Sequence, residues 1–168
     1  FAKATDELVL AQRAGTLQRN FQGYSTHGHC DIVGLGVSAI GRIGDSYSQN
    51  ARDLMGYYGA LDAGRLPVAR GLELDEDDLI RRELIGELMC HGVVDKQQFG
   101  ARHRLLFDEY FVRARERLAP LVADGLVEDD AREVRVTSRG RLLLRIIAMC
   151  FDAYLDDKAQ AARYSRVI

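Results

Sequence analysis

The sequence predicts an α/β part followed by a mainly α, winged-helix-like domain, and two observations favour this division. Residues 17–50 contain six glycines with amide and aromatic side chains and almost no helical period. Residues 75–162 show apolar side chains at the spacing of helices. Because the segment 65–74 contains a proline and a glycine between these regions, we place the boundary between residues 1–66 and 67–168.

Composition and charge restrict the possible partners. The chain has 168 residues, 47% of them hydrophobic, which is enough for one or two small domains. The net charge of −2 predicts no general attraction to nucleic acid or to an anionic membrane. The apolar runs are far shorter than the roughly 20 residues that cross a bilayer, and no signal peptide precedes them, so we expect a cytoplasmic protein. The start at Phe1 suggests a piece of a longer protein.

The three cysteines indicate neither a disulfide framework nor a clustered metal site. Cys30, Cys90 and Cys150 are odd in number and widely separated in the sequence. We therefore predict three reduced thiols, two of them in apolar helical surroundings.

The first unit is expected to open with a short helix and a loop. Asp6 precedes an apolar-spaced run that stops at Gly15, which predicts a capped helix. Residues 18–26 follow neither a helical nor a strand period, and Gly23 indicates a turn. We therefore predict an ordered loop over residues 18–26.

A buried strand and a helix are expected to complete the first unit. Residues 31–37 are small or branched and are interrupted by glycines, as in a buried strand that another backbone or a ligand approaches closely. Ser48 is predicted to cap a helix over residues 49–63, which stops at Gly64. The segment 65–74 is predicted to be a linker.

The second unit is expected to begin with two long helices. Asp75 and the acidic first turn after it predict the start of a helix that runs to Gly92. Apolar residues repeat at helical spacing over residues 107–121, which predicts a second helix that bends or restarts at Pro120.

A hairpin and a third helix are expected to follow. Residues 126–128 and 134–136 flank a polar turn, as in a small β-hairpin. Thr137 or Ser138 is then predicted to cap a long helix from residue 141 to about residue 162. Helix, helix, hairpin and helix in this order indicate a winged-helix-like domain.

The glycines around Ile40 raise the question of a nucleotide site. Residues 34–39 match the G-x-G-x-x-A dinucleotide pattern, but that pattern requires a helix to start within it, and Gly41 and Gly44 argue against one. We therefore drop the dinucleotide interpretation. Glycines beside Ile40 would still let a flat ring lie against the backbone next to an apolar side chain.

A cluster of possible metal ligands near residue 30 is interpreted as ordinary surface. His27, His29, Cys30 and Asp31 carry ligand types that suit zinc or iron, but four adjacent residues cannot easily all turn toward one ion, so we expect exposed loop residues.

A basic group follows the predicted hairpin. Arg139, Arg141 and Arg145 could contact DNA if the hairpin were a wing. The four acidic residues in the segment 128–133 would repel phosphates, so we interpret the arginines as a solvated face.

For one further cluster, the residues alone do not distinguish a ligand site from a turn. Residues 20–24 combine side-chain amides with aromatic rings beside Gly23, which suits both a polar, planar ligand and an ordinary turn.

At these residues the sequence resembles the oxygen-independent coproporphyrinogen III oxidase (coproporphyrinogen dehydrogenase) family of the radical S-adenosylmethionine (SAM) class. The matching motifs occur in the family's order over nearly the whole chain. They are QRNFQGY (18–24), GVSAI (36–40), IGD (43–45), QN (49–50), VT (136–137), GRLL (140–143), MCFD (149–152) and SRVI (165–168).

The resemblance implies a fold and an activity. Residues 1–66 would be an α/β barrel remnant, the C-terminal end of a radical-SAM partial TIM-like barrel, and residues 67–168 the family's helical C-terminal domain. With a [4Fe-4S] cluster and S-adenosylmethionine, the family uses a 5′-deoxyadenosyl radical to convert two propionates of coproporphyrinogen III into vinyls, which gives protoporphyrinogen IX.

The resemblance also implies site residues. Ile40 would contact the S-adenosylmethionine at the cluster, while Phe21 and Gln22 would line the cavity near a second S-adenosylmethionine or the substrate. The family's C-x-x-x-C-x-x-C cluster motif and its glycine-rich S-adenosylmethionine motif are absent from this chain. We therefore expect no catalytic or metal-binding residue in the fragment and no activity of the fragment alone.

The partners implied are coproporphyrinogen III and an electron donor or acceptor, with no nucleic acid and no membrane, and the full-length protein is expected to be a monomer. One alternative is a related haem-binding chaperone, but that family is expected to carry Asn-x-x-Tyr-Trp where this chain reads NFQGYS from Asn20, and the chain has no tryptophan. The other alternative is a winged-helix DNA-binding module, which the acidic hairpin disfavours.

Overall fold

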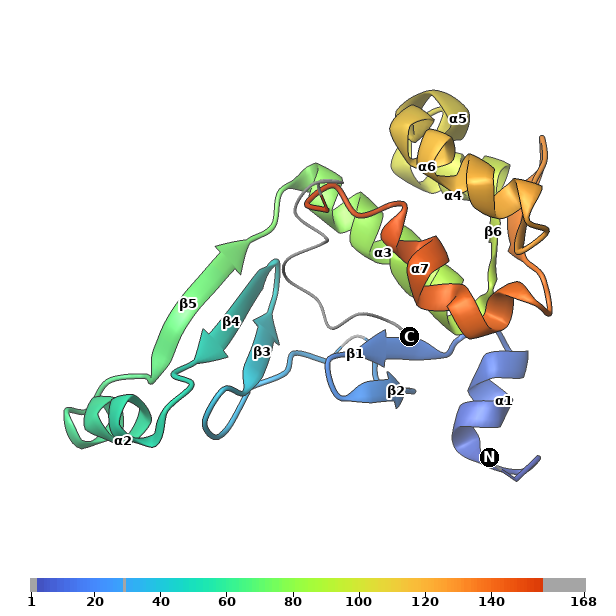
Figure 1. Ribbon diagram of the computed structural model, residues 1–168. Coiled ribbons are helices and arrows are strands. Elements are labelled where there is room, and N and C mark those ends of the chain that lie inside the picture. The colour runs from blue at the N-terminus through green and yellow to red at the C-terminus, as the bar shows by residue number, and fades with distance from the viewer. Residues whose placement is uncertain (1–2, 29, 156–168) are drawn as a thin grey trace.

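The computed structural model describes residues 3–28 and 30–155, which form a mixed α/β arrangement with small antiparallel sheets (Figure 1). The first part, residues 3–73, holds two short helices and two of these sheets. The second part, residues 74–155, holds the remaining helices around a third sheet.

The first helix, α1 (Glu7–Arg13), forms as predicted. The Asp6 carboxylate accepts a hydrogen bond from the Leu8 backbone N–H at 2.9 Å, and Gly15 follows the helix with a φ of +71°.

The predicted loop over residues 18–26 is wrong, because this segment is a β-hairpin. Strand β1 (Gln18–Asn20) pairs with β2 (Gly23–Ser25), and the Asn20 side chain accepts a hydrogen bond from the Gln22 backbone N–H at 2.8 Å in the turn. Three-residue strands are too short to show an alternating pattern in the sequence, so the turn was visible and the strands were not.

A three-stranded antiparallel sheet makes up most of the rest of the first part. Its order is β3 (Ile40–Ile43), β4 (Ser46–Asn50) and β5 (Val68–Glu73). The predicted linker 65–74 therefore contains a strand, and all six residues of β5 are exposed, so no apolar alternation marked it.

The helix predicted over residues 49–63 is shorter than expected. Ser48 lies within β4, and α2 (Leu54–Asp62) is capped by Asp53, whose carboxylate accepts a hydrogen bond from the Gly56 N–H at 2.7 Å. The stop at Gly64 is confirmed, since this glycine has a φ of +68°.

The buried strand predicted over residues 31–37 is also wrong. This segment makes only an isolated bridge between Ile32 and Arg42, and Val33 and Leu35 are 68% and 85% exposed. The close approach at Gly34 is confirmed, because a Cβ there would lie 2.9 Å from the Ile40 carbonyl. The segment thus packs its glycine, not its apolar side chains, against the sheet.

Helix α3 (Glu76–His91) confirms the prediction in detail. Asp75 and Asp78 form a reciprocal capping box at its start, and Gly92 ends it with a φ of +72°. Strand β6 (Val93–Asp95) and helix α4 (Lys96–His103) come next and were not predicted.

The second predicted helix is interrupted at a different place. It consists of α5 (Phe107–Tyr110) and α6 (Val112–Ala123), so the break lies at Phe111, and Pro120 stays inside α6. The Phe111 ring is buried and packs against Phe107 and Phe151, so core packing determines where the helix breaks.

The predicted hairpin is confirmed, and the last helix is corrected. Strands β7 (Val127–Asp129) and β8 (Glu133–Val136) pair, and β8 also pairs with β6. A 3₁₀ turn, η1 (Gly140–Leu143), leads into α7 (Leu144–Met149), and residues 150–155 form turns instead of continuing the predicted helix. The last part of that prediction, residues 156–162, lies outside the described residues. The predicted cap at Thr137 or Ser138 is not the N-cap of either element, since η1 is preceded by Arg139 and α7 by Leu143, although the Gly140 N–H donates a hydrogen bond to the Thr137 hydroxyl oxygen at 3.1 Å. The SRVI motif at 165–168 lies outside the described residues.

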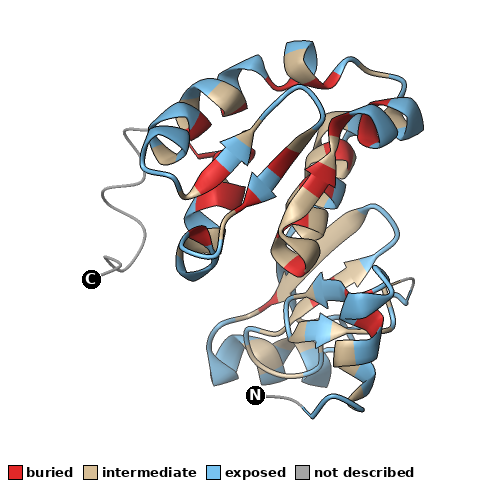
Figure 2. Cartoon of the chain, turned by 90° about the vertical axis from the view of Figure 1, so that its right-hand side faces the viewer, coloured by how far each residue is buried: buried red, intermediate tan, exposed pale blue. Residues whose placement is uncertain are grey.

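Most of the buried apolar residues gather in the second part (Figure 2). One cluster joins α3, the α4–α6 helices, the β6–β8 sheet and α7, and its fully buried members include Leu84, Phe99, Leu118 and Ile147. In the first part, a small cluster of Ala11 and Leu17 packs against Cys90 of α3.

Candidate functional site

A groove of about 1130 Å³ lies between the two parts of the chain. One wall comes from β1 and from the β3–β4 strands, and the other comes from α3, α4 and α7. Contacts between β1 and the end of α3 close one end of it, where the Tyr24 hydroxyl donates a hydrogen bond to the Met89 carbonyl at 3.3 Å. Both parts of the chain are therefore needed to form the groove.

The strand register places a set of polar and apolar side chains on one face of the first-part sheet. Ile40 is paired with Gln49, and Arg42 with Tyr47, so these four side chains share a face. Arg42 and Tyr47 line the groove. The face that contains Ile40 is thus the face of the sheet that borders the groove.

Phe21 reaches the same region from the β1–β2 turn. Its ring packs edge-on against the Tyr47 ring with centroids 5.1 Å apart, lines the groove and remains 52% exposed. Gln22 is exposed in the same turn and is not among the groove residues. Ile40 is partly buried at the start of β3. The structure therefore brings Phe21 to the sheet face that carries Ile40, with Gln22 beside it in the turn.

Sequence reasoning did not single out Arg42 or Tyr47. Gly44 and Asp45 between two short runs were a hairpin signal, and the pairing register that follows from such a turn would have placed both side chains on one face. Arg42 is held in position by hydrogen bonds from its guanidinium to the Gly28 and Cys30 carbonyls at 3.0 and 2.7 Å.

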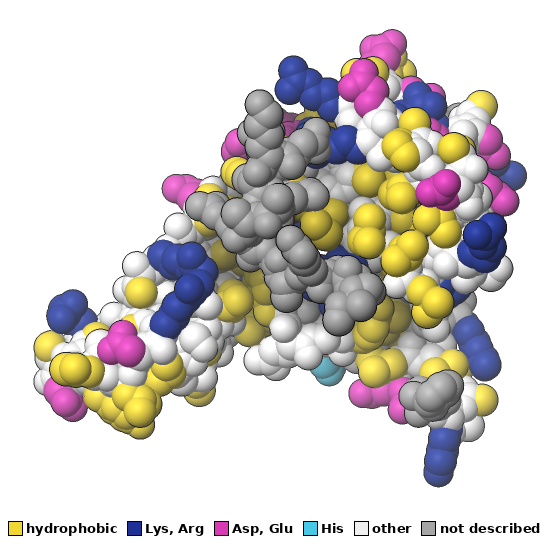
Figure 3. Space-filling view, viewed as in Figure 1, with side chains coloured by type: hydrophobic (Ala, Val, Ile, Leu, Met, Phe, Trp, Pro, Cys, Tyr) yellow, Lys and Arg dark blue, Asp and Glu magenta, His cyan; other side chains and the backbone are white. Residues whose placement is uncertain are grey.

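The groove carries more positive than negative side chains. Its arginines come from both walls, and they are Arg19, Arg42, Arg82, Arg102 and Arg145. The acidic residues that line it are Glu83, Glu87 and Asp152. A further basic patch lies over the β4–β5 part of the sheet (Figure 3), which contains arginines and no lysine, and there Arg70 donates two hydrogen bonds to the Gln49 side-chain oxygen.

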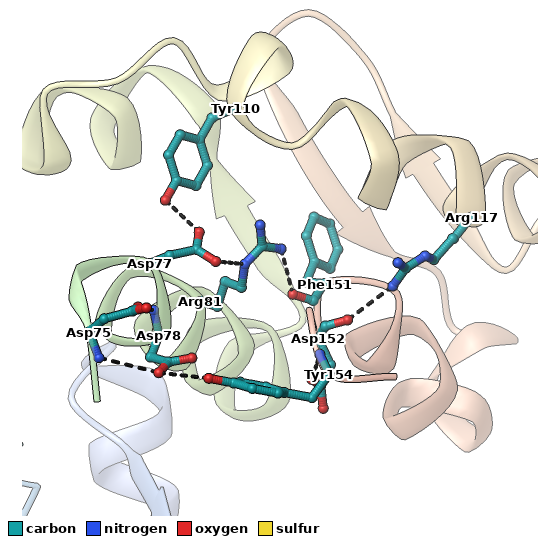
Figure 4. A network of polar contacts seen from close by, with 9 residues as sticks. All are labelled: Asp75, Asp77, Asp78, Arg81, Tyr110, Arg117, Phe151, Asp152 and Tyr154. Carbon is teal, nitrogen blue, oxygen red and sulfur yellow. Dashed lines mark hydrogen bonds and ion pairs between the residues drawn. The ribbon is translucent and has the colours of Figure 1, made fainter. Parts of the chain in front are cut away.

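A polar network holds the end of α7 against α3 and so shapes one wall of the groove (Figure 4). Arg81 donates a hydrogen bond to the Phe151 carbonyl, and Arg117 donates one to the Asp152 carbonyl, each at 2.9 Å. Tyr154 is exposed and donates a hydrogen bond to Asp78 at 3.0 Å.

Asp77 anchors the α3 side of this network. Burial alone would raise the pKa of Asp77, but hydrogen bonds from Arg81 and Tyr110 lower it from its ordinary value. Burial and the hydrogen bond to Asp77 raise the pKa of Tyr110 to about 12. The carboxylate is therefore charged at neutral pH and the phenol is protonated, which preserves the contact.

The predicted surface clusters take different places. His27, Cys30 and Asp31 are exposed, as predicted, and His29 lies outside the described residues. Cys30, Cys90 and Cys150 are free thiols, and burial raises the pKa of the last two. Among residues 3–28 and 30–155, no group of three or more His, Cys, Asp or Glu side chains could hold a metal ion.

The arginines that follow the hairpin are not a uniform patch. Arg139 and Arg141 are exposed, whereas Arg145 lines the groove. In the hairpin, the Asp129 carboxylate pairs with Lys96 and Arg115 at 2.6 and 2.8 Å. No described helix is long and apolar enough to cross a membrane.

Comparisons with known proteins match this chain to one family model and to several curated relatives. Residues 74–143 match the family described as HemN C-terminal domain. The chain is 49% identical over its whole length to the oxygen-independent coproporphyrinogen III oxidase of Pseudomonas aeruginosa, and 48% identical to that of Escherichia coli. It spans 36% and 37% of the length of these two relatives.

The fold of this chain also matches a solved structure. A solved structure of the E. coli coproporphyrinogen III oxidase, described as a radical SAM enzyme, superimposes with a TM-score of 0.87 and 48% identity. The match covers 92% of this chain and 36% of that structure.

Proposed function

Because this chain is homologous to the C-terminal part of the oxygen-independent coproporphyrinogen III oxidases, we propose that it serves as that part of such an enzyme. The reaction would be the oxidative decarboxylation of two propionates of coproporphyrinogen III to vinyls, which gives protoporphyrinogen IX. The observation that carries this proposal is the 48–49% identity over the whole length of the chain. An electron donor or acceptor would be the other partner of the monomeric enzyme.

The two parts of the chain suit different roles in this enzyme. The first part would be the end of the α/β barrel, and the second part, with its three-stranded sheet among helices, would be the winged-helix-like C-terminal domain. The HemN C-terminal domain match begins at residue 74, directly after β5 ends at Glu73. We therefore move the proposed boundary between the two parts from residue 66 to residue 73.

The implied cofactors divide between this chain and the rest of the enzyme. The described residues offer no group of cysteines for a [4Fe-4S] cluster, since Cys30 is exposed while Cys90 and Cys150 are buried at separate places. S-adenosylmethionine suits the groove better, because Phe21 is half exposed and Ile40 is accessible on the sheet face beside it. In this proposal Ile40 contacts S-adenosylmethionine, and Phe21 and Gln22 lie near a second molecule or the substrate.

The chain itself then supplies binding surface. Its aromatic rings and apolar side chains can pack against flat, apolar parts of the ligands, and the groove arginines that are not already paired with a carboxylate at hydrogen-bond distance can bind the ligand carboxylates. The second wall, held by the α3–α7 network, limits access of water to that space.

Turnover under anaerobic conditions tests the proposal. The whole enzyme, in which this chain is joined to the part that corresponds to the remaining length of its relatives, is expected to convert coproporphyrinogen III when S-adenosylmethionine and a reductant are present. Product porphyrins are separated by chromatography after oxidation. The 168-residue chain alone is expected to form no product, because it lacks a group of cluster ligands.

Omission of S-adenosylmethionine is the matched control and should abolish product formation. A whole enzyme that leaves coproporphyrinogen III unchanged would contradict the proposed activity. Turnover by the chain alone would contradict its proposed role as a binding part.

A further inference from the structure

Among the residues that the structure describes, Arg82 of α3 carries the one buried side-chain nitrogen or oxygen atom without a hydrogen bond or a close charged partner. Three side-chain nitrogen or oxygen atoms of the described residues are buried without a hydrogen bond. His103 Nε2 still lies 3.2 Å from a Glu83 oxygen, and Asp129 Oδ1 lies 2.6 Å from Lys96 Nζ. The third atom, Arg82 Nη1, has no such neighbour among the residues described.

The rest of the Arg82 guanidinium is only loosely paired. Its Nη2 lies 3.9 Å from a carboxylate oxygen of Asp45, which is beyond hydrogen-bond distance, and the side chain is 35% exposed. A guanidinium carries five N–H donors, and each one that is shielded from water without an acceptor is unfavourable. Arg82 therefore lacks the acceptors that its environment requires.

Neighbouring arginines show that this condition is particular to Arg82. Arg81, the preceding residue, donates hydrogen bonds to Asp77 and to the Phe151 carbonyl, as Figure 4 shows. Arg102 lines the same groove as Arg82, but it pairs with Glu83 at 3.1 Å and with Glu87 at 2.8 Å. Side chains of α3 thus pair with Arg81 of the same helix and with Arg102 of α4, and Arg82 lines the groove without such a pair.

The surroundings of Arg82 favour an anionic ligand. Arg19 and Arg145 also line the groove, and neither forms an ion pair within the described part of the chain. At about 1130 Å³ the groove exceeds the roughly 300–1,000 Å³ usual for small-molecule sites, which is compatible with a ligand of tetrapyrrole size. Arginine binds carboxylates through two parallel N–H···O bonds.

We propose that Arg82 binds a propionate carboxylate of the tetrapyrrole substrate in this groove. The assignment rests on the function proposed above, because that function supplies the tetracarboxylate. Propionate oxygens would provide the acceptors that the Arg82 guanidinium lacks, and Arg19 and Arg145 would add to the positive potential that attracts the ligand. S-adenosylmethionine also carries a carboxylate, so the two ligands must be measured separately.

Binding of coproporphyrin III to the whole enzyme tests the assignment. This porphyrin keeps the four propionates of coproporphyrinogen III, is stable in air and reports binding by its fluorescence. Arg82→Gln is expected to raise the Kd for coproporphyrin III about tenfold or more, because a charge-assisted pair is lost. The KM for S-adenosylmethionine should not change, and Arg82→Lys should restore part of the affinity.

Arg102→Gln is the matched control, since it removes the same charge from the same groove where Glu83 and Glu87 already neutralise it. Its Kd for coproporphyrin III should rise much less than that of Arg82→Gln, because no direct contact with the ligand is lost. Thermal unfolding of Arg82→Gln should match the wild type, because Arg82 makes no hydrogen bond within the described residues.

The outcomes separate this inference from the proposed function. Wild-type affinity for coproporphyrin III in Arg82→Gln would overturn the assignment, and continued turnover of coproporphyrinogen III would leave the proposed function intact. A rise in the KM for S-adenosylmethionine with an unchanged porphyrin Kd would assign Arg82 to the other ligand and would also overturn it. If the wild-type enzyme neither binds coproporphyrin III nor converts coproporphyrinogen III, both proposals fail.

Discussion

Ile40 and Ile43 begin and end the same short strand, and they point to opposite faces of the sheet. Ile40 shares its face with the two groove residues Arg42 and Tyr47, whereas Ile43 is 56% exposed on the other face. The glycines that drew attention to Ile40 in the sequence act on the backbone: Gly34 packs directly against the Ile40 carbonyl. At this position the sequence predicted close packing, and the register determined which face the side chain occupies.

Ile40→Ala in the whole enzyme is expected to raise the KM for S-adenosylmethionine roughly tenfold, because several apolar carbons of the proposed contact are removed. Ile43→Ala deletes the same carbons from the same strand on the opposite face and should leave that KM unchanged. Steady-state kinetics at saturating coproporphyrinogen III measures both. Equal effects of the two substitutions would show that strand stability, not ligand contact, is being measured.

Phe21 and Gln22 show that residue types alone do not decide between a ligand site and a turn. Amides and a ring beside a glycine suited both a ligand site and an ordinary turn, and the structure shows the turn, with Asn20 accepting the Gln22 N–H. The same turn presents the Phe21 ring to Tyr47 and to the groove. The two interpretations are therefore compatible, and the role of Gln22 remains a proposal.

Four elements of the second part are joined by a buried ionic network. Lys96, at the start of α4, is only 5% exposed and contacts Asp129 of β7 at 2.6 Å and Asp108 of α5 at 2.8 Å. Arg115 of α6 also contacts both carboxylates, at 2.8 Å from Asp129 and at 3.2 Å from Asp108. The network connects residues that are distant in the sequence and fixes the hairpin relative to the helices.

Lys96→Met is expected to lower the free energy of unfolding by about 3 kcal/mol, because removing one partner leaves the Asp129 carboxylate, whose side chain is 9% exposed, with less compensation. Urea unfolding followed by circular dichroism measures the loss. Arg132→Met is the control, since that arginine is 81% exposed and 3.8 Å from Asp95, so about 0–1 kcal/mol is expected. A loss for Lys96→Met no larger than that of Arg132→Met would contradict the structural role of the network.

The elements differ in how far the sequence predicts them. Helix α3 was predicted to its caps, because its apolar stripe, its acidic first turn and Gly92 are all local signals. The sheet β3–β5 was missed, because β5 exposes every residue and is defined only by hydrogen bonds to β4. Elements that carry their own apolar face were visible in the sequence, and elements that depend on a partner strand were not.

Breaks within elements follow the same rule. Pro120 was the local signal for a helix break, but α6 continues through it to Ala123, so the loss of the one hydrogen bond that a proline cannot donate does not end the helix. The observed break at Phe111 places a large ring against Phe107 and Phe151 in the core. The short α7 likewise ends where Arg81 and Arg117 bind the Phe151 and Asp152 carbonyls.

At the scale of the whole molecule, the two parts have unequal cores. The larger cluster of buried apolar residues runs from Ile80 to Phe151, whereas the first part contributes only Ala11 and Leu17 to a buried cluster. Large apolar side chains of α2 and of the loop before β3 remain exposed, among them Met55 and Leu35. The second part is therefore expected to be the more stable unit.

Separate expression of residues 74–168 and residues 1–73 tests this expectation. Residues 74–168 should unfold in a single cooperative transition in urea, because this fragment contains the larger core. Residues 1–73 should show no cooperative transition, because their sheets have few buried side chains. Circular dichroism follows both. Cooperative unfolding of residues 1–73 alone would contradict the expected dependence on packing against other surfaces.

The sequence by itself determined helix α3 with its caps, the β7–β8 hairpin and the resemblance that led to the proposed function, because these depend on local patterns and on motifs in order. Only the tertiary structure decided that Phe21, Tyr47 and Arg42 meet at one groove and that Arg82 faces it without a close partner. The physical reason is that strand register and ion pairing join residues far apart in the sequence, and no local period encodes which partners they find.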